Sequence, residues 1–169
     1  MRIILHIYHG NGKGKTTSAI GLSIRAVGAG LKVIFVQFLK DGNSSEINIL
    51  EKMADIKILY CNICNKFTFQ MNNAEKLIVT ERHNFMINQA FSEKADMIIL
   101  DEFLDAYNKN MIDKKISEKL ILKNIEKEII LTGRNPSELF LEKADYISEI
   151  NSIRHPYEKG ITARKGIEY

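Results

Sequence analysis

The feature that most constrains this 169-residue chain is a glycine-rich segment directly after a short apolar run. Residues 10–17 read Gly-Asn-Gly-Lys-Gly-Lys-Thr-Thr, and residues 3–8 read Ile-Ile-Leu-His-Ile-Tyr. A strand followed by a glycine-rich turn, a lysine, a hydroxyl and a helix is typical of a phosphate-binding P-loop. Glycines allow several backbone N–H groups to point at one anion, and the start of the helix adds its positive end. The pattern predicts that the chain binds a nucleoside triphosphate.

The loop departs from the strict pattern G-x-x-x-x-G-K-[ST] at its first position, where this chain has His9. We therefore assign the bend to Gly10. We expect Lys15 to supply a full positive charge and Thr16 to offer its hydroxyl to Mg²⁺. A glycine-rich turn also occurs without a ligand, but the glycines, lysines and threonines together disfavour that alternative. The residues predicted to bind the nucleotide here are Gly10, Asn11, Gly12, Lys13, Gly14, Lys15, Thr16 and Thr17.

The composition is that of an ordinary globular protein, with 45% apolar residues, 27% charged residues and a net charge of +3. The chain is long enough to bury a core as a single nucleotide-binding domain over residues 1–169. Its weak net charge and the absence of an 18-residue apolar run favour neither a nucleic-acid nor a membrane partner. Because a strand begins near the N-terminus, we expect no signal peptide and a cytoplasmic location.

Cys61 and Cys64 form a C-x-x-C pair, which occurs in zinc sites and in redox pairs. The chain has no second such pair, and its four histidines show no ligand spacing. We therefore favour two reduced thiols.

Apolar runs alternate with helical stretches along the chain. Several runs are nearly continuous in Val, Ile and Leu, which is typical of strands covered on both faces. We therefore predict an α/β protein with a three-layer P-loop NTPase-like fold, a mainly parallel sheet and helices on both faces. The expected strands are 3–8, 33–38, 56–60, 97–100, 128–132 and 146–150, and the expected helices are about 16–29, 46–54, 73–94, 113–125 and 136–143. Asn72 and Glu75 resemble a capping box at the start of the longest helix.

Asp101 and Glu102 end the apolar run 97–100, at the position where P-loop proteins place an acid that helps to hold Mg²⁺. Such a pair also caps a following helix, but the P-loop favours the metal-binding interpretation. One unit charge at 4 Å contributes only about 4 kcal/mol at an effective dielectric constant of 20. Lys15 alone therefore does not balance a triphosphate, and we expect Mg²⁺ on Thr16, Asp101 and Glu102.

Two arginines and one pair of phenylalanines have two interpretations each. Arg134, in Thr-Gly-Arg after the run 128–132, is either a phosphate ligand or a surface arginine. Arg25 is either a ligand contact or a structural ion pair. Phe67 and Phe69 either contact a flat apolar ligand or pack under their own loop as a small satellite core, and the packed alternative is the more usual one.

Several segments in this order resemble the P-loop class of corrinoid adenosyltransferases from the first strand to the last residue. They are the loop 10–17, Arg-Ala-Val-Gly at 25–28, Val-Gln-Phe-Leu-Lys at 36–40, Phe-Thr-Phe at 67–69, Leu-Asp-Glu at 100–102, Leu-Thr-Gly-Arg at 131–134, Ala144-Asp145 with Glu149, and the tail from His-Pro-Tyr at 155–157 to Gly-Ile-Glu-Tyr at 166–169.

The resemblance implies transfer of the 5′-deoxyadenosyl group of ATP to the Co(I) centre of a reduced corrinoid, with release of triphosphate. Lys15, Thr16 and Glu102 would be the catalytic residues, because Lys15 and the Mg²⁺ held through Thr16 and Glu102 neutralise the leaving group. Arg25 and Arg134 would join the loop in binding ATP. No protein nucleophile is required, because cobalt is the nucleophile.

The same resemblance places Phe67 and Phe69 on the corrinoid, where the loop strips the lower axial ligand of cobalt. The second aromatic is typically Trp in this family, whereas this chain has no Trp, and Lys66 stands where glycine is usual. The implied partners are a corrinoid (cobalamin, cobinamide or cobyrinate) and an electron-donating reductase, and a homodimer is a further expectation. The alternatives are another P-loop ATPase or small-molecule kinase, which moves the γ-phosphate, and a nucleotide-binding regulatory module.

Overall fold

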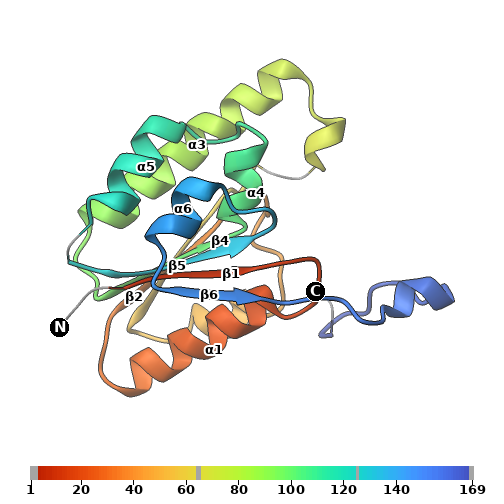
Figure 1. Cartoon of the computed structure of the whole chain (residues 1–169), viewed down its shortest axis with the longest axis horizontal. Helices are drawn as coiled ribbons and strands as arrows, with labels where there is room; N and C mark the ends of the chain where they lie inside the picture. The colour runs from red at the N-terminus through yellow and green to blue at the C-terminus, as the bar shows by residue number, and fades with distance from the viewer. Residues whose placement is uncertain (1–3, 64–65, 125, 168–169) are drawn as a thin grey trace.

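The computed structural model describes residues 4–63, 66–124 and 126–167, and within them six parallel strands form one sheet (Figure 1). The strand order is β3-β2-β4-β5-β1-β6, and each neighbouring pair runs parallel. The strands are β1 (Leu5–His9), β2 (Val33–Gln37), β3 (Ile56–Tyr60), β4 (Met97–Asp101), β5 (Glu128–Gly133) and β6 (Tyr146–Glu149). All six predicted strands are confirmed, with ends that differ by at most one residue apart from the start of β1, where the predicted first residue, Ile3, lies outside the described residues.

Helices cover both faces of this sheet, which confirms the predicted three-layer α/β fold (Figure 1). The helices are α1 (Lys15–Gly28), α2 (Ile47–Leu50), α3 (Asn73–Ser92), α4 (Phe103–Asn108), α5 (Lys114–Leu122) and α6 (Glu138–Lys143), with short 3₁₀ turns at η1 (Thr68–Gln70) and η2 (Pro156–Lys159). The prediction for 46–54 was too long, and α4 was not predicted. Six residues directly after a strand carry too little periodicity to reveal a helix.

The nearly continuous apolar strands supply two separate cores, because successive side chains point to opposite faces. In β2, Val33 and Phe35 join the core beneath α1 and α2, whereas Ile34 and Val36 join the core beneath α3–α6. All four are at most 2% exposed. A strand buried on both faces needs apolar residues at every position, which explains the lack of alternation in the sequence.

The longest helix, α3, begins with the capping box that the sequence predicts. The Asn72 side chain accepts a hydrogen bond from the Glu75 N–H, and the Glu75 carboxylate accepts one from the Asn72 N–H, both at 2.9 Å. Two otherwise orphaned donors are thereby satisfied.

The carboxyl ends of the parallel strands meet at one edge of the sheet, where α/β proteins bind ligands. The P-loop follows β1 at this edge, and residues 101–102 lie at the end of β4. The tail from residue 151 projects beyond the sheet and includes η2 (Figure 1). Among the described residues, no helix has both the length and the apolar character that a bilayer span requires.

Candidate functional site

Two P-loop glycines pack against the chain that leaves β6. Gly10 has φ +116°, and a Cβ added there would lie 2.4 Å from the Ile150 carbonyl oxygen. At Gly12 the same oxygen would lie 2.7 Å from an added Cβ, and the Gly12 N–H donates to it at 2.7 Å. The bend is therefore at Gly10, as expected from the shifted pattern. These glycines allow a close approach of two backbones, a reason that the sequence did not reveal.

The second half of the loop carries the cation and the hydroxyl. The Lys15 ammonium donates to the Gly12 carbonyl at 2.8 Å, so it lies back across its own loop. Burial lowers the pKa of Lys15, and the positive charge of Arg134 lowers it further. An anion bound beside Lys15 would relieve both effects, because it would compensate the buried charge.

The acid pair lies beside this hydroxyl. The Asp101 carboxylate is fully buried, and its Oδ1 accepts hydrogen bonds from the hydroxyls of Thr16 and Thr132, each at 2.8 Å. Glu102 has φ +59°, a left-handed conformation that turns the chain from β4 into α4. Its N–H donates to the Thr132 oxygen at 2.9 Å. Thr132 thus ties both acids to β5, a role that sequence reasoning missed.

Lys40 is a second residue of the site that the sequence prediction omitted. Its ammonium lies 3.1 Å from Asp101 Oδ2 and 3.8 Å from Glu102 Oε1. Burial by itself lowers the pKa of Lys40, but the negative charges of Asp101 and Glu102 outweigh burial, so the pKa of Lys40 is raised. Burial, and then the charge of Asp101, raises the pKa of Glu102. The available signal was the position of Lys40, three residues beyond the end of β2 at the ligand-binding edge.

The donor set at this corner fits Mg²⁺, which prefers one or two carboxylates together with phosphate and water oxygens. Thr16, Asp101 and Glu102 supply a hydroxyl and two carboxylates. Gln37 is fully buried, and its Oε1 accepts no hydrogen bond from the part of the chain that the structure describes. The Lys40 ammonium shows that this corner already accommodates a cation.

A cleft of about 1020 Å³ joins these groups. Its lining includes Asn11 to Thr17 of the P-loop, Lys40, Glu102, Arg134, Lys66, Phe67 and Gln70, with His155, Gly166 and Ile167 of the tail. Arg134 thus lines the cleft, and its backbone N–H donates to the Asp105 carboxylate at 2.9 Å.

The structure does not bring Arg25 to this cleft. Arg25 lies ten residues after Lys15 on α1, which is about 15 Å along the helix axis. The Arg25 side chain is exposed, and its charge is close enough to act on Tyr8. Burial raises the pKa of Tyr8, and the positive charge of Arg25 offsets part of that rise. The expected ATP contact of Arg25 therefore has no support in this conformation, because helix geometry carries the residue away from the loop.

The aromatic loop presents its rings to the solvent. Phe67 is 69% exposed and Phe69 is 80% exposed, and their rings stack with centroids 5.5 Å apart. The alternative in which they pack under their own loop is wrong. Phe67 lines the cleft, whereas Phe69 lies outside its lining. The Lys66 ammonium pairs with Glu75, which ties this loop to the start of α3.

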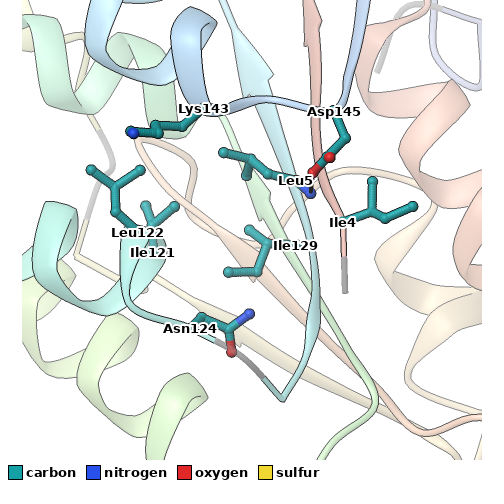
Figure 2. A pocket seen from close by; sticks show the side chains of 8 residues that line it. All are labelled: Ile4, Leu5, Ile121, Leu122, Asn124, Ile129, Lys143 and Asp145. Carbon is teal, nitrogen blue, oxygen red and sulfur yellow. Dashed lines mark hydrogen bonds between the residues drawn. The ribbon is translucent and has the colours of Figure 1, made fainter. Parts of the chain in front are cut away.

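Two other features lie outside this cleft. Cys61 is buried after β3, whereas Cys64 lies outside the described residues, so the predicted thiol pair stays a prediction. A cavity of about 140 Å³ opens at the opposite edge of the sheet (Figure 2). It is lined mostly by apolar side chains, with Lys143 and Asp145 at its margin. Its position at the amino ends of β1 and β5 separates it from the P-loop.

Comparison with known proteins gives one consistent family. The family model described as ATP:corrinoid adenosyltransferase BtuR/CobO/CobP matches residues 2–169. The corrinoid adenosyltransferase of Escherichia coli K12 is 32% identical over 99% of this chain and 86% of its own length. Corrinoid adenosyltransferase CobA of Salmonella typhimurium LT2 has the same identity and the same coverage of both chains.

Among solved structures, the KaiC-like protein PH0186 from Pyrococcus horikoshii OT3 has 17% identity and a TM-score of 0.49, over 89% of this chain and 73% of that chain. The family assignment rests on the sequence matches, which cover nearly the whole chain. This chain belongs to the ATP:corrinoid adenosyltransferase family.

Proposed function

We propose that this protein transfers the 5′-deoxyadenosyl group of ATP to the Co(I) centre of a reduced corrinoid. A Co–C5′ bond forms with the electron pair of cobalt, the C5′–O bond breaks, and its electrons leave with the triphosphate. The observation that carries the proposal is the shared cleft. It joins a P-loop cation and Glu102 of the acid pair, with Asp101 buried directly behind, to an exposed aromatic ring. The first two suit a triphosphate with its metal, and the ring suits a flat macrocycle.

In this proposal the P-loop binds the leaving group. Lys15 and Arg134 neutralise the phosphate oxygens, and the remaining loop residues, Gly10 to Gly14 and Thr17, shape the loop around them. Thr16, Asp101 and Glu102 would hold Mg²⁺, which would supply further positive charge to the triphosphate when bound. The catalytic contribution of Lys15, Thr16 and Glu102 is charge stabilisation and positioning, with no proton transfer required.

Phe67 and Phe69 would contact the corrinoid. Their apolar surface is left largely exposed by the residues that the structure describes, so a ligand that covers it gains hydrophobic stabilisation. Phenylalanine offers less area than the tryptophan usual in this family, and the stacked pair supplies one continuous apolar face.

The wider assignments belong to the same proposal. We infer that residues 1–169 act as a single nucleotide-binding domain in the cytoplasm, with cobalamin, cobinamide or cobyrinate as acceptor. An electron-donating reductase would generate Co(I), because the proposed nucleophile is a reduced metal and the chain contains few candidate redox groups of its own. A homodimer is consistent with the exposed apolar side chains of α3, namely Leu77, Ile78 and Phe85.

An anaerobic assay tests the transfer, with chemically reduced cob(I)alamin, ATP and Mg²⁺. We expect a light-sensitive Co–C product and one triphosphate per corrinoid, both abolished by Lys15→Ala. Formation of ADP and phosphate irrespective of corrinoid would instead support the kinase or hydrolase alternative.

Phe67→Ala tests the aromatic contact separately. We expect a KM for corrinoid raised at least about tenfold, with the KM for ATP little changed, because in this proposal Phe67 contacts the corrinoid and the P-loop contacts the ATP phosphates. The matched control is Tyr146→Ala, since Tyr146 is also exposed but lies on β6 outside the cleft. Equal effects of the two variants would remove Phe67 from the corrinoid site.

A further inference from the structure

Lys40 is not part of the P-loop pattern, yet its ammonium contacts both carboxylates of the acid pair. Its ammonium lies 3.1 Å from Asp101 and 3.8 Å from Glu102, whereas Lys15 donates to its own loop. The Asp101 side chain is fully buried and that of Glu102 is 27% exposed. A buried carboxylate beside a partly buried one requires a compensating charge, and Lys40 provides it in the free protein.

The local backbone holds Lys40 in this position. Phe38 is fully buried and fixes the chain in the core, and the next residue, Leu39, has φ +57°. This left-handed conformation is unfavourable for leucine and persists only where surrounding contacts hold it. The Leu39 N–H donates to Nε2 of buried His83 at 3.3 Å, and Nδ1 of His83 donates to the Met111 carbonyl at 2.8 Å. A strained turn fixed by a buried imidazole thus directs Lys40 toward the acids.

Lys40 and a divalent cation compete for the same oxygens. A metal on Asp101 and Glu102 would add two positive charges beside the ammonium and create a like-charge repulsion. The side chain of Lys40 is 31% exposed and lines the cleft together with Lys15, so a nearby anionic ligand is within the region that it can reach.

We propose that Lys40 is a resident counterion of the acid pair that passes to the triphosphate of ATP when the divalent metal replaces it. The proposal rests on the proposed function for the identity of the anion. It makes binding of metal alone unfavourable and binding of metal together with nucleotide favourable. Lys40 therefore couples the binding of metal and nucleotide. The metal displaces Lys40 from the carboxylates so that it can bind the triphosphate, and the triphosphate holds Lys40 away from the metal site.

Binding of Mn²⁺ tests the exchange without any adenosyl transfer. Mn²⁺ would be titrated into the full chain by electron paramagnetic resonance, with and without ATP, in the wild type, Lys40→Met and Lys57→Met. We expect Lys40→Met to bind Mn²⁺ alone about tenfold more tightly than the wild type and Mn²⁺–ATP about tenfold more weakly. Lys57→Met is the matched control, because Lys57 pairs with Glu93 at 2.6 Å on the surface outside the cleft.

A second measurement uses only the wild type, in case Lys40→Met does not fold. Reductive methylation of Lys40, followed by peptide mass spectrometry, would report how accessible its ammonium is. We expect slow labelling in the free protein, faster labelling with Mn²⁺ alone, and renewed protection with Mn²⁺ and ATP. Unchanged Mn²⁺ affinity in Lys40→Met, or unchanged labelling on addition of metal, would overturn the exchange. If the wild type and Lys40→Met bind Mn²⁺ as expected but the wild type transfers no adenosyl group, only the proposed function is contradicted.

Discussion

Two physical constraints determine which residue types the site tolerates: close contacts of the backbone and compensation of buried charge. Gly10 and Gly12 are glycines because a neighbouring carbonyl occupies the place of their Cβ, whereas Gly14 has φ +120° with open space around it. Asp101 is tolerated in full burial because two hydroxyls and Lys40 surround it. Each position therefore has a distinct physical penalty for substitution.

The glycine contact predicts a large loss of stability for Gly10→Ala. A new Cβ would lie 2.4 Å from a backbone oxygen at a positive φ, so both a clash and strain arise. We expect the free energy of unfolding to fall by about 2–4 kcal/mol in urea titrations. Gly21→Ala is the control, because Gly21 is an exposed glycine within α1 with open space, and there we expect a gain of about 0.5–1 kcal/mol. Similar losses for both variants would contradict the packing argument.

Thr132 makes a second prediction at this scale. Thr132→Val keeps the shape but leaves the Glu102 N–H without its acceptor and removes one donor to Asp101. Because Thr132 is 1% exposed, we expect a loss of about 1–3 kcal/mol in the free energy of unfolding, together with weaker Mg²⁺–ATP binding by calorimetry. Thr80→Val is the comparison, since its hydroxyl donates to the Lys76 carbonyl within its own helix, α3. Equal stability and ATP affinity in Thr132→Val and the wild type would remove Thr132 from the site.

At the level of elements, short α4 determines how the acid pair is presented. It begins directly after Glu102, and four of its six residues are buried against the core. Its Tyr107 hydroxyl donates to the Glu118 carboxylate of α5, so the two helices are joined by a charge-assisted hydrogen bond. Burial, and then this carboxylate, raises the pKa of Tyr107 to about 12.

This hydrogen bond predicts a specific alkaline loss of stability. The pKa of Tyr107 is higher in the folded than in the unfolded chain, so its contribution is complete below pH 10 and is lost as the pH rises toward about 12. We expect Tyr107→Phe to be less stable than the wild type by about 1–2 kcal/mol at pH 8, with the difference shrinking between pH 10 and 12. Urea unfolding at each pH measures it, with Tyr157→Phe in the exposed tail as control. A difference independent of pH would contradict the assigned cause.

At the scale of the whole molecule, the sheet order assembles the site. β5 lies between β1 and β4, so Thr132 at its end lies between the P-loop and the acid pair. β2 lies on the other side of β4 and delivers Lys40 from there. Segments separated by 31 to 85 residues thus meet at Asp101, because parallel strands end at one edge.

This assembly predicts that ATP and Mg²⁺ together stabilise the entire fold. At a concentration 100 times the dissociation constant, the gain is about 2.7 kcal/mol, which corresponds to a rise in Tm of about 5–10 °C for a chain of this size. Differential scanning calorimetry with ATP, with and without EDTA, measures the effect, and Lys15→Ala should lose most of it. A rise that persists in Lys15→Ala would place ATP elsewhere.

The sequence by itself determined the six strands, the P-loop, the acid pair and the family, because each depends on local order along the chain. Apolar runs specify buried strands, and a glycine-rich turn before a helix specifies an anion site. The capping box at Asn72 could also be predicted from the sequence, because its two residues lie three positions apart in the chain.

Tertiary structure alone decided the strand order, the exposure of the aromatic loop, the separation of Arg25 from the cleft, and the parts played by Lys40 and Thr132. Each depends on which strands become neighbours and on where a helix carries a side chain. A lysine after one strand and a threonine on another acquire their roles only when both come within 3.1 Å of the same buried carboxylate. Such contacts between distant segments leave no local pattern in a single sequence.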